Sequence, residues 1–192
     1  MPDSVDWAGM WAAYDESTYQ AALDFLEPGS FILDIGAGDL RLAGRAVTRG
    51  CTVFAIERQL AVIRQARPEV LSLEQLYIVA ADARLIPFPP GLDAALLLMR
   101  HCEDYALYVG KLRACGCPKL ITNARWRMGV ECIPLEPGVA FKADRVGWYA
   151  CVRCGATAFI PVQDERSQCD WLKPGIDLDY VNVEGCPHCL PT

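Results

Sequence analysis

Apolar runs alternate with amphipathic stretches over the first two thirds of the chain. Runs that are apolar on both faces, and short enough to be buried strands, occur at residues 31–36, 51–57, 76–82, 92–99 and 119–124. Stretches with helical spacing of apolar residues occur at residues 14–26, 40–49, 59–66 and 103–114. Periodicity by itself leaves a buried helix open for the third and fourth apolar runs.

This alternation predicts an α/β fold. Strands that are buried on both faces need helices on both sides of one sheet. Right-handed crossovers between such strands make the sheet mostly parallel and doubly wound. We therefore expect a Rossmann-like sheet, whose ligands bind outside the carboxyl ends of the strands.

The pattern changes after about residue 128. The last third has frequent Gly and Pro, short β-like runs such as residues 147–162, and no stretch with convincing helical spacing. We predict two modules, residues 1–128 and residues 129–192, of which the second is small and β-rich.

The composition is that of a globular protein, with 53% hydrophobic and 22% charged residues among 192. No run approaches the roughly 18 consecutive apolar residues that a membrane helix needs. The acidic N-terminal segment lacks the features of a signal peptide, so we expect a cytoplasmic protein without membrane contact. The net charge of −6 argues against broad binding to nucleic acid but leaves a local Arg patch open.

The segment 32–40, ILDIGAGDL, is an apolar strand that runs into a glycine-rich turn. Gly36 and Gly38 let the backbone approach a ligand closely, and Asp34 lies just before the turn. A turn that receives the pyrophosphate of NAD has a third glycine where this chain has Arg41, and acidic neighbours repel a pyrophosphate. The turn therefore favours a ligand with a positive centre and an amino group, such as S-adenosylmethionine.

Two further acidic residues, Glu57 and Asp82, end the second and third predicted strands. Glu57 lies 19 residues beyond Gly38, which is the separation at which an acidic residue meets a ribose. A carboxylate suits that position because it accepts hydrogen bonds from both ribose hydroxyls. The carboxyl ends of parallel strands share one edge of the sheet, so we expect these side chains to line one site.

This arrangement resembles the class I S-adenosylmethionine-dependent methyltransferases over about residues 14–125. Their first motif, D/E-x-G-x-G at the end of the first strand, is matched by Asp34, Gly36 and Gly38. The resemblance implies that the chain binds S-adenosylmethionine. It also places Glu57 on the ribose hydroxyls and Asp82 near the adenine amino group.

Leu40 departs from the family pattern, because many members have a third glycine there. We interpret it as a packing variant that places a side chain on the buried face of the next helix, with Asp39 as the helix cap. The alternative is that Asp34 and Asp39 serve only as a turn residue and a helix cap.

The segment after the fourth predicted strand, residues 99–104, carries candidate catalytic groups. It lacks the Asn/Asp-Pro-Pro-Tyr type motif with which family members methylate the amino group of adenine, so that acceptor is disfavoured. His101 is the candidate general base, unless it only belongs to the strand-to-helix turn, and Arg100 is a candidate cofactor contact. Tyr14 is either a lid over the cofactor or a core or surface aromatic.

Two C-x-x-C pairs stand out among the ten cysteines. Cys151 and Cys154 form one pair, Cys186 and Cys189 the other, and 31 residues (155–185) separate them. In a reducing compartment paired cysteines more often bind metal than form disulfides. Four thiolates suit a closed, tetrahedral structural zinc site, and the β-like flanks resemble a zinc ribbon. A redox pair and an iron–sulfur cluster are the alternatives.

The sequence thus predicts a methyltransferase with a structural zinc ion, acting on RNA, protein or a small molecule. One alternative is a non-catalytic S-adenosylmethionine-binding module whose ribbon docks a partner protein; another is a nicotinamide-dependent oxidoreductase. Arg125, Trp126 and Arg127 follow the fifth predicted strand. They either bind an aromatic or anionic acceptor, or pack at the boundary between the modules.

Overall fold

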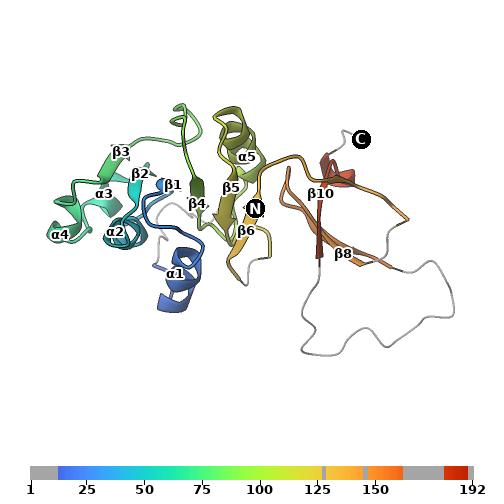
Figure 1. Ribbon diagram of the computed structural model, residues 1–192, viewed down its shortest axis with the longest axis horizontal. Helices are drawn as coiled ribbons and strands as arrows, with labels where there is room; N and C mark the ends of the chain where they lie inside the picture. The colour runs from blue at the N-terminus through green and yellow to red at the C-terminus, as the bar shows by residue number, and fades with distance from the viewer. Residues whose placement is uncertain (1–12, 127–128, 145–146, 162–179, 190–192) are drawn as a thin grey trace, which may run out of the picture.

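The computed structural model describes residues 13–126, 129–144, 147–161 and 180–189. In this part of the chain one sheet has the strand order β3-β2-β1-β4-β5-β6 (Figure 1). Its strands are β1 (Phe31–Ile35), β2 (Thr52–Glu57), β3 (Leu76–Ala80), β4 (Ala94–Leu97), β5 (Lys119–Thr122) and β6 (Glu131–Pro134). Strands β1 to β5 run parallel, and β6 is antiparallel to β5. The predicted mostly parallel sheet is confirmed.

Helices cover both faces of this sheet. They are α1 (Glu16–Leu23), α2 (Arg41–Thr48), α3 (Leu60–Ile63), α4 (Pro68–Leu71) and α5 (Tyr105–Ala114). Successive residues of β1 point into different cores, as a strand requires. Ile32 packs in a cluster with side chains of α1 and α2, whereas Leu33 packs in a cluster with side chains of α5. No helix of the described chain is long and apolar enough to cross a bilayer.

The short helix α4 is absent from the sequence-based prediction. Pro68 is expected there to end a helix, but in the structure it begins one, at the first position of α4. Proline suits that position because its φ is already helical and its missing N–H has no partner in a first turn. The preceding helix α3 already ends at Ile63, before Pro68, so in the structure the proline begins a helix and does not end one.

The C-terminal part forms a second, smaller sheet with the order β7-β10-β8-β9. Its strands are β7 (Val139–Ala140), β8 (Gly147–Cys151), β9 (Thr157–Ile160) and β10 (Tyr180–Glu184). A 3-10 turn, η2 (Pro187–Cys189), follows β10. The predicted small β-rich module is confirmed.

The large sheet extends beyond the predicted module boundary at residue 128, since β6 pairs along its length with β5. Two contacts of α5 hold the second module. Arg113 donates to both carboxylate oxygens of Glu184, at 2.9 and 2.8 Å. A Cβ added to Gly155 would lie 2.9 Å from the ring of Tyr105, so the backbone after Cys154 packs directly on that ring.

The turn after β1 uses three left-handed backbone positions. Gly36 and Gly38 have φ values of 72° and 57°, and Leu40 has a φ of 63°. Leu40 is also the N-cap residue of α2 and is fully buried. The prediction that Asp39 caps this helix is therefore wrong by one residue. Asp39 still accepts a hydrogen bond from the backbone N–H of Arg41, at 3.2 Å.

Leu40 combines a strained backbone with a well-packed side chain. The left-handed conformation costs a leucine about 1–2 kcal/mol, while truncating a buried leucine costs about 2–5 kcal/mol. The packing term exceeds the strain, so leucine is net stabilising at this position, in agreement with its interpretation as a packing variant.

We expect both Leu40→Ala and Leu40→Gly to lower the free energy of unfolding, and the glycine variant to be the more stable of the two by about 1 kcal/mol, because only glycine relieves the strain. Urea unfolding measures both values. Leu42, which is buried within α2, provides the matched control. There alanine should be more stable than glycine by about 1 kcal/mol. The same order at both positions would contradict the strain at Leu40.

Candidate functional site

A pocket of about 700 Å³ opens at the carboxyl ends of β1 to β4. Most of the residues that the sequence singles out line it: Tyr14, Asp34, Gly36, Gly38, Glu57, Asp82 and His101. Glu103 and Asp104 also line it, so its wall carries five carboxyl groups against the two guanidinium groups of Arg58 and Arg84. Asp34, Glu57 and Asp82 thus line one pocket at the same edge of the sheet, as expected.

Asp34 lies at the base of this pocket. Asp34 is 3% exposed, and its buried Oδ2 atom has no hydrogen-bond partner within the part of the chain that the structure describes. Burial, reinforced by the nearby charge of Glu57, raises the pKa of Asp34 to about 7. A buried carboxylate with an unused acceptor favours a ligand that brings a positive charge or a hydrogen-bond donor.

Glu57 is buried near Asp34, and each of its carboxylate oxygens accepts one hydrogen bond from a backbone N–H group. Its Oε2 accepts from the N–H of Gly38 at 3.0 Å, and its Oε1 accepts from the N–H of Gln59 at 2.8 Å. These bonds fix the orientation of the carboxylate. Each oxygen has a second lone pair, so Glu57 keeps acceptor capacity for a ligand.

The glycines of the turn have a packing reason as well. A Cβ added to Gly36 would lie 2.2 Å from the Cε atom of Met99. The N–H groups of Gly36 and Ala37 both donate to the carbonyl of Ile56, at 2.8 and 3.0 Å. The turn is therefore hydrogen-bonded to β2 and packs directly against Met99, which follows β4.

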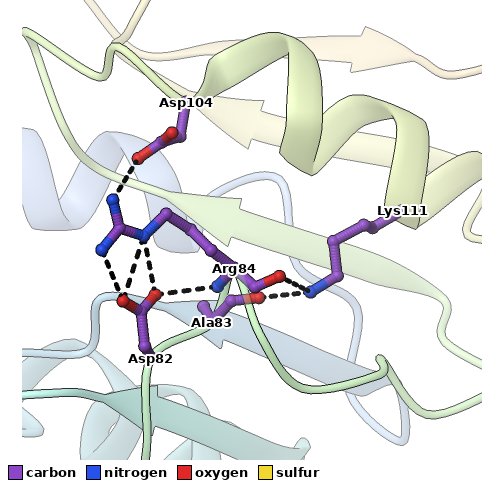
Figure 2. A network of polar contacts seen from close by, with 5 residues as sticks. All are labelled: Asp82, Ala83, Arg84, Asp104 and Lys111. Atoms are coloured by element: carbon purple, nitrogen blue, oxygen red, sulfur yellow. Dashed lines mark hydrogen bonds and ion pairs between the residues drawn. The ribbon is translucent and has the colours of Figure 1, made fainter.

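Asp82 does not present a free carboxylate (Figure 2). Arg84 donates to it from its backbone N–H at 2.9 Å and from its side chain, with Nη2 at 2.6 Å. These bonds lower the pKa of Asp82 to about 2. Arg84 is not among the site residues predicted from the sequence. A cation two residues after an acidic strand end is a weak but readable signal for such a pair.

Lys111 of α5 holds the segment that carries Arg84. Its ammonium donates to the carbonyls of Ala83, Arg84 and Ile86, as Figure 2 shows for the first two. It also lies 4.3 Å from the centre of the Phe88 ring. An ammonium has three donors, so three carbonyls satisfy it.

Arg100 is not among the residues that line the pocket. Its guanidinium lies 5.0 Å from the centre of the Tyr14 ring, and its backbone N–H donates to the Tyr14 hydroxyl at 3.2 Å. Arg100 thus positions Tyr14, which lines the pocket. His101 is exposed and lines the pocket.

The four cysteines of the C-x-x-C pairs come together. One sulfur each from Cys151, Cys154, Cys186 and Cys189 lies within 4.8 Å of all the others. The Sγ atoms of Cys151 and Cys189, and those of Cys154 and Cys186, are 3.5 Å apart. Tetrahedral zinc with Zn–S bonds of about 2.3 Å separates its sulfurs by about 3.8 Å, so the cluster has the right size.

Arg125 and Trp126 pack between the modules. Arg125 is 4% exposed and donates to both carboxylate oxygens of Glu131, at 2.9 and 2.6 Å. The ring of Trp126 lies 5.1 Å from that of Tyr180 and 6.0 Å from that of Trp148. These contacts favour the boundary interpretation. Arg127, like Cys169, lies outside the described residues.

No protein-family model and no curated protein matches this chain. Solved structures match over somewhat more than half of it. YjhP from E. coli is 19% identical, covering 57% of this chain and 49% of that one, with a TM-score of 0.50. A 1,6-didemethyltoxoflavin-N1-methyltransferase from Burkholderia thailandensis, solved with S-adenosylhomocysteine, is 22% identical over 56% of this chain and 52% of that one, with a TM-score of 0.45.

A phosphoethanolamine N-methyltransferase from Haemonchus contortus, in complex with S-adenosyl-L-methionine, is 19% identical over 56% of this chain and 27% of that one, with a TM-score of 0.49. The chain spans about half the length of the first structures it matches. At these identities the likeness concerns the fold. The observed strand order and the match to YjhP confirm the predicted doubly wound, mostly parallel Rossmann-like fold.

The raised pKa of Asp34 has a consequence for stability. A carboxyl that binds its proton more tightly in the folded chain contributes stability at low pH, and this contribution is lost as pH rises from about 4 to about 7. We expect the wild-type protein without ligand to lose stability across this range relative to Asp34→Asn, by an amount on the order of a few kcal/mol. Urea unfolding of both proteins from pH 4 to pH 8 measures the difference. Parallel curves would contradict a buried, proton-binding Asp34.

Proposed function

We propose that the chain is an S-adenosylmethionine-dependent methyltransferase whose cofactor binds in the pocket at the carboxyl ends of β1 to β4. The observation that carries the proposal is Asp34, a buried carboxylate with an unused oxygen at the base of a pocket of about 700 Å³. S-adenosylmethionine fits this site because it brings a sulfonium and an ammonium. A pyrophosphate, as in NAD, would meet an acidic wall.

The residues of the pocket have separate tasks in this proposal. Asp34, once ionised, balances the positive charge of the ligand, and Gly36 and Gly38 let the backbone approach it. Glu57, held by two backbone N–H groups, accepts from the ribose hydroxyls. Asp82 lies at the end of the pocket that would receive the base.

When bound, S-adenosylmethionine supplies a methyl group activated by a positively charged sulfur. The chain then has to orient the acceptor, exclude water and take up a proton if the acceptor loses one. His101 is the candidate for the last task, because it lines the pocket and an imidazole ring nitrogen can act as a general base. RNA, a protein and a small molecule all stay open as acceptors.

A non-catalytic S-adenosylmethionine-binding module is the second candidate. The absence of an Asn/Asp-Pro-Pro-Tyr type motif after β4 is the feature that favours it. Extract from a deletion strain, incubated with the protein and cofactor labelled in its methyl group, separates the two. Label transferred to RNA, protein or small molecules supports the enzyme, and binding without transfer to any of them supports the module.

We expect S-adenosylhomocysteine to bind and NAD not to bind. Glu57→Ala should weaken binding of S-adenosylhomocysteine by about 1.5–3 kcal/mol, since hydrogen bonds to a charged group are lost. Isothermal titration calorimetry gives both affinities. Glu103→Ala is the matched control: it also removes one negative charge from the pocket wall, but should change the affinity little. Unchanged affinity in a folded Glu57→Ala protein would remove Glu57 from the site.

We further propose that Cys151, Cys154, Cys186 and Cys189 hold one structural zinc ion. Elemental analysis should give about one zinc per chain. Cys186→Ser should lose it and unfold the small sheet at lower temperature, because metal binding contributes to the folding of such modules. Cys132→Ser, outside the cluster, should retain full zinc content. Iron with visible absorption, or full zinc in Cys186→Ser, would contradict the assignment.

A further inference from the structure

Arg84 occupies most of the acceptor capacity of Asp82. The Oδ1 atom of Asp82 accepts from the backbone N–H and from Nε of Arg84, at 2.9 and 3.0 Å. The Oδ2 atom accepts from Nε and Nη2 of Arg84, at 3.0 and 2.6 Å. A carboxylate has about four lone-pair sites. Three donor hydrogens of Arg84 share these sites, so a ligand donor that reaches Asp82 competes with Arg84 for the carboxylate.

Asp82 lies where the base of a nucleoside would reach. The ends of β1, β2 and β3 are neighbours in that order, and neighbouring strands are about 4.8 Å apart. The turn after β1 and Asp82 are thus separated by roughly 10 Å across the pocket, with Glu57 between them. A ribose at Glu57 directs its base toward Asp82 and Arg84, both of which line the pocket.

Arg84 has an alternative position available. Its side chain is 42% exposed, and its Nη1 atom lies 3.6 Å from the Oδ2 atom of Asp104, at the start of α5 (Figure 2). Asp104 therefore offers the guanidinium a second carboxylate partner when a ligand displaces it from Asp82.

The backbone around Arg84 does not depend on this side chain. Lys111 holds the carbonyls of Ala83, Arg84 and Ile86. The N–H of Leu85 also donates to the carbonyl of Asp82, at 3.0 Å. Removing the guanidinium should therefore leave the backbone of this loop in place, so that a mutation of Arg84 reports on its side chain alone.

We propose that Arg84 competes with the base of the bound nucleoside for Asp82, and so sets the affinity and the base selectivity of the pocket. The proposal rests on the proposed cofactor site. With Arg84 in place, the pocket offers guanidinium donors to the base; with Arg84 displaced, it offers the Asp82 carboxylate. The first state accepts a carbonyl on the base, and the second accepts an amino group.

A double-mutant cycle with S-adenosylhomocysteine tests the competition. Arg84→Met should bind it about 3- to 10-fold more tightly than wild type, the value of one hydrogen bond. Asp82→Asn should lose about tenfold in the Arg84→Met background, but less than about twofold in wild type, where release of Arg84 offsets the lost bond. Melting temperatures check that all four proteins are folded.

Base selectivity gives a readout that a purely structural role would not move. S-inosylhomocysteine carries a carbonyl in place of the amino group on the base. Wild type should bind the two nucleosides with similar affinity, whereas Arg84→Met should prefer the amino compound by about tenfold, because a carbonyl then faces an unpaired carboxylate. Arg58→Met is the matched control: it removes another cation of the pocket wall and should leave this preference unchanged.

The outcomes separate the two proposals. Weaker binding by Arg84→Met, or equal losses from Asp82→Asn in both backgrounds, would overturn the competition while leaving the cofactor site intact. The same change of preference in Arg58→Met would attribute the effect to charge alone and would also overturn it. No binding of S-adenosylhomocysteine by any of the four folded proteins would overturn the proposed function, and the competition with it.

Discussion

The hydrogen bond from the backbone N–H of Gly38 to Glu57 is the contact on which the site depends. It closes the turn after β1 over the end of β2, and the bonds from Gly36 and Ala37 to the carbonyl of Ile56 reinforce it. Closing the turn also buries Asp34 next to a second carboxylate. Two neighbouring carboxylates that are both shielded from solvent destabilise the protein when no ligand is bound, because burial and mutual repulsion disfavour their charged forms. A positively charged ligand offsets this destabilisation. The bonds that close the turn therefore also create the charge preference of the pocket.

Among the described residues, side chains of the first module attach the small sheet. Arg113 binds Glu184, Tyr105 supports the backbone at Gly155, and Trp126 packs against aromatic rings of β8 and β10. Its own buried cluster is small and consists largely of the cysteines and their neighbours. A module with so little apolar core needs a further source of stability, which is the physical reason for assigning a metal to the cysteines.

The sequence predicts much of the large sheet because burial on both faces leaves a continuous apolar signature in strands such as β1 and β2. It also predicts Asp34, Glu57 and the cysteine cluster, since their positions follow from strand ends and spacing. It does not predict the pairing of β6 with β5, because an edge strand of four residues has little pattern of its own. The left-handed backbone of Leu40 and the loss of the Asp82 carboxylate to Arg84 are also hidden, since each results from tertiary packing.

The central claim is that the pocket binds a cation against Asp34. Its most direct measurement is the number of protons released when S-adenosylmethionine binds at pH 6, obtained by calorimetry in buffers of different ionisation enthalpy. With a pKa of about 7, Asp34 is mostly protonated at that pH and must ionise to balance the ligand. The account predicts release of up to about one proton with S-adenosylmethionine, less with the uncharged sulfur of S-adenosylhomocysteine, and none in Asp34→Asn. Equal release for both ligands, or release that persists in Asp34→Asn, would contradict it.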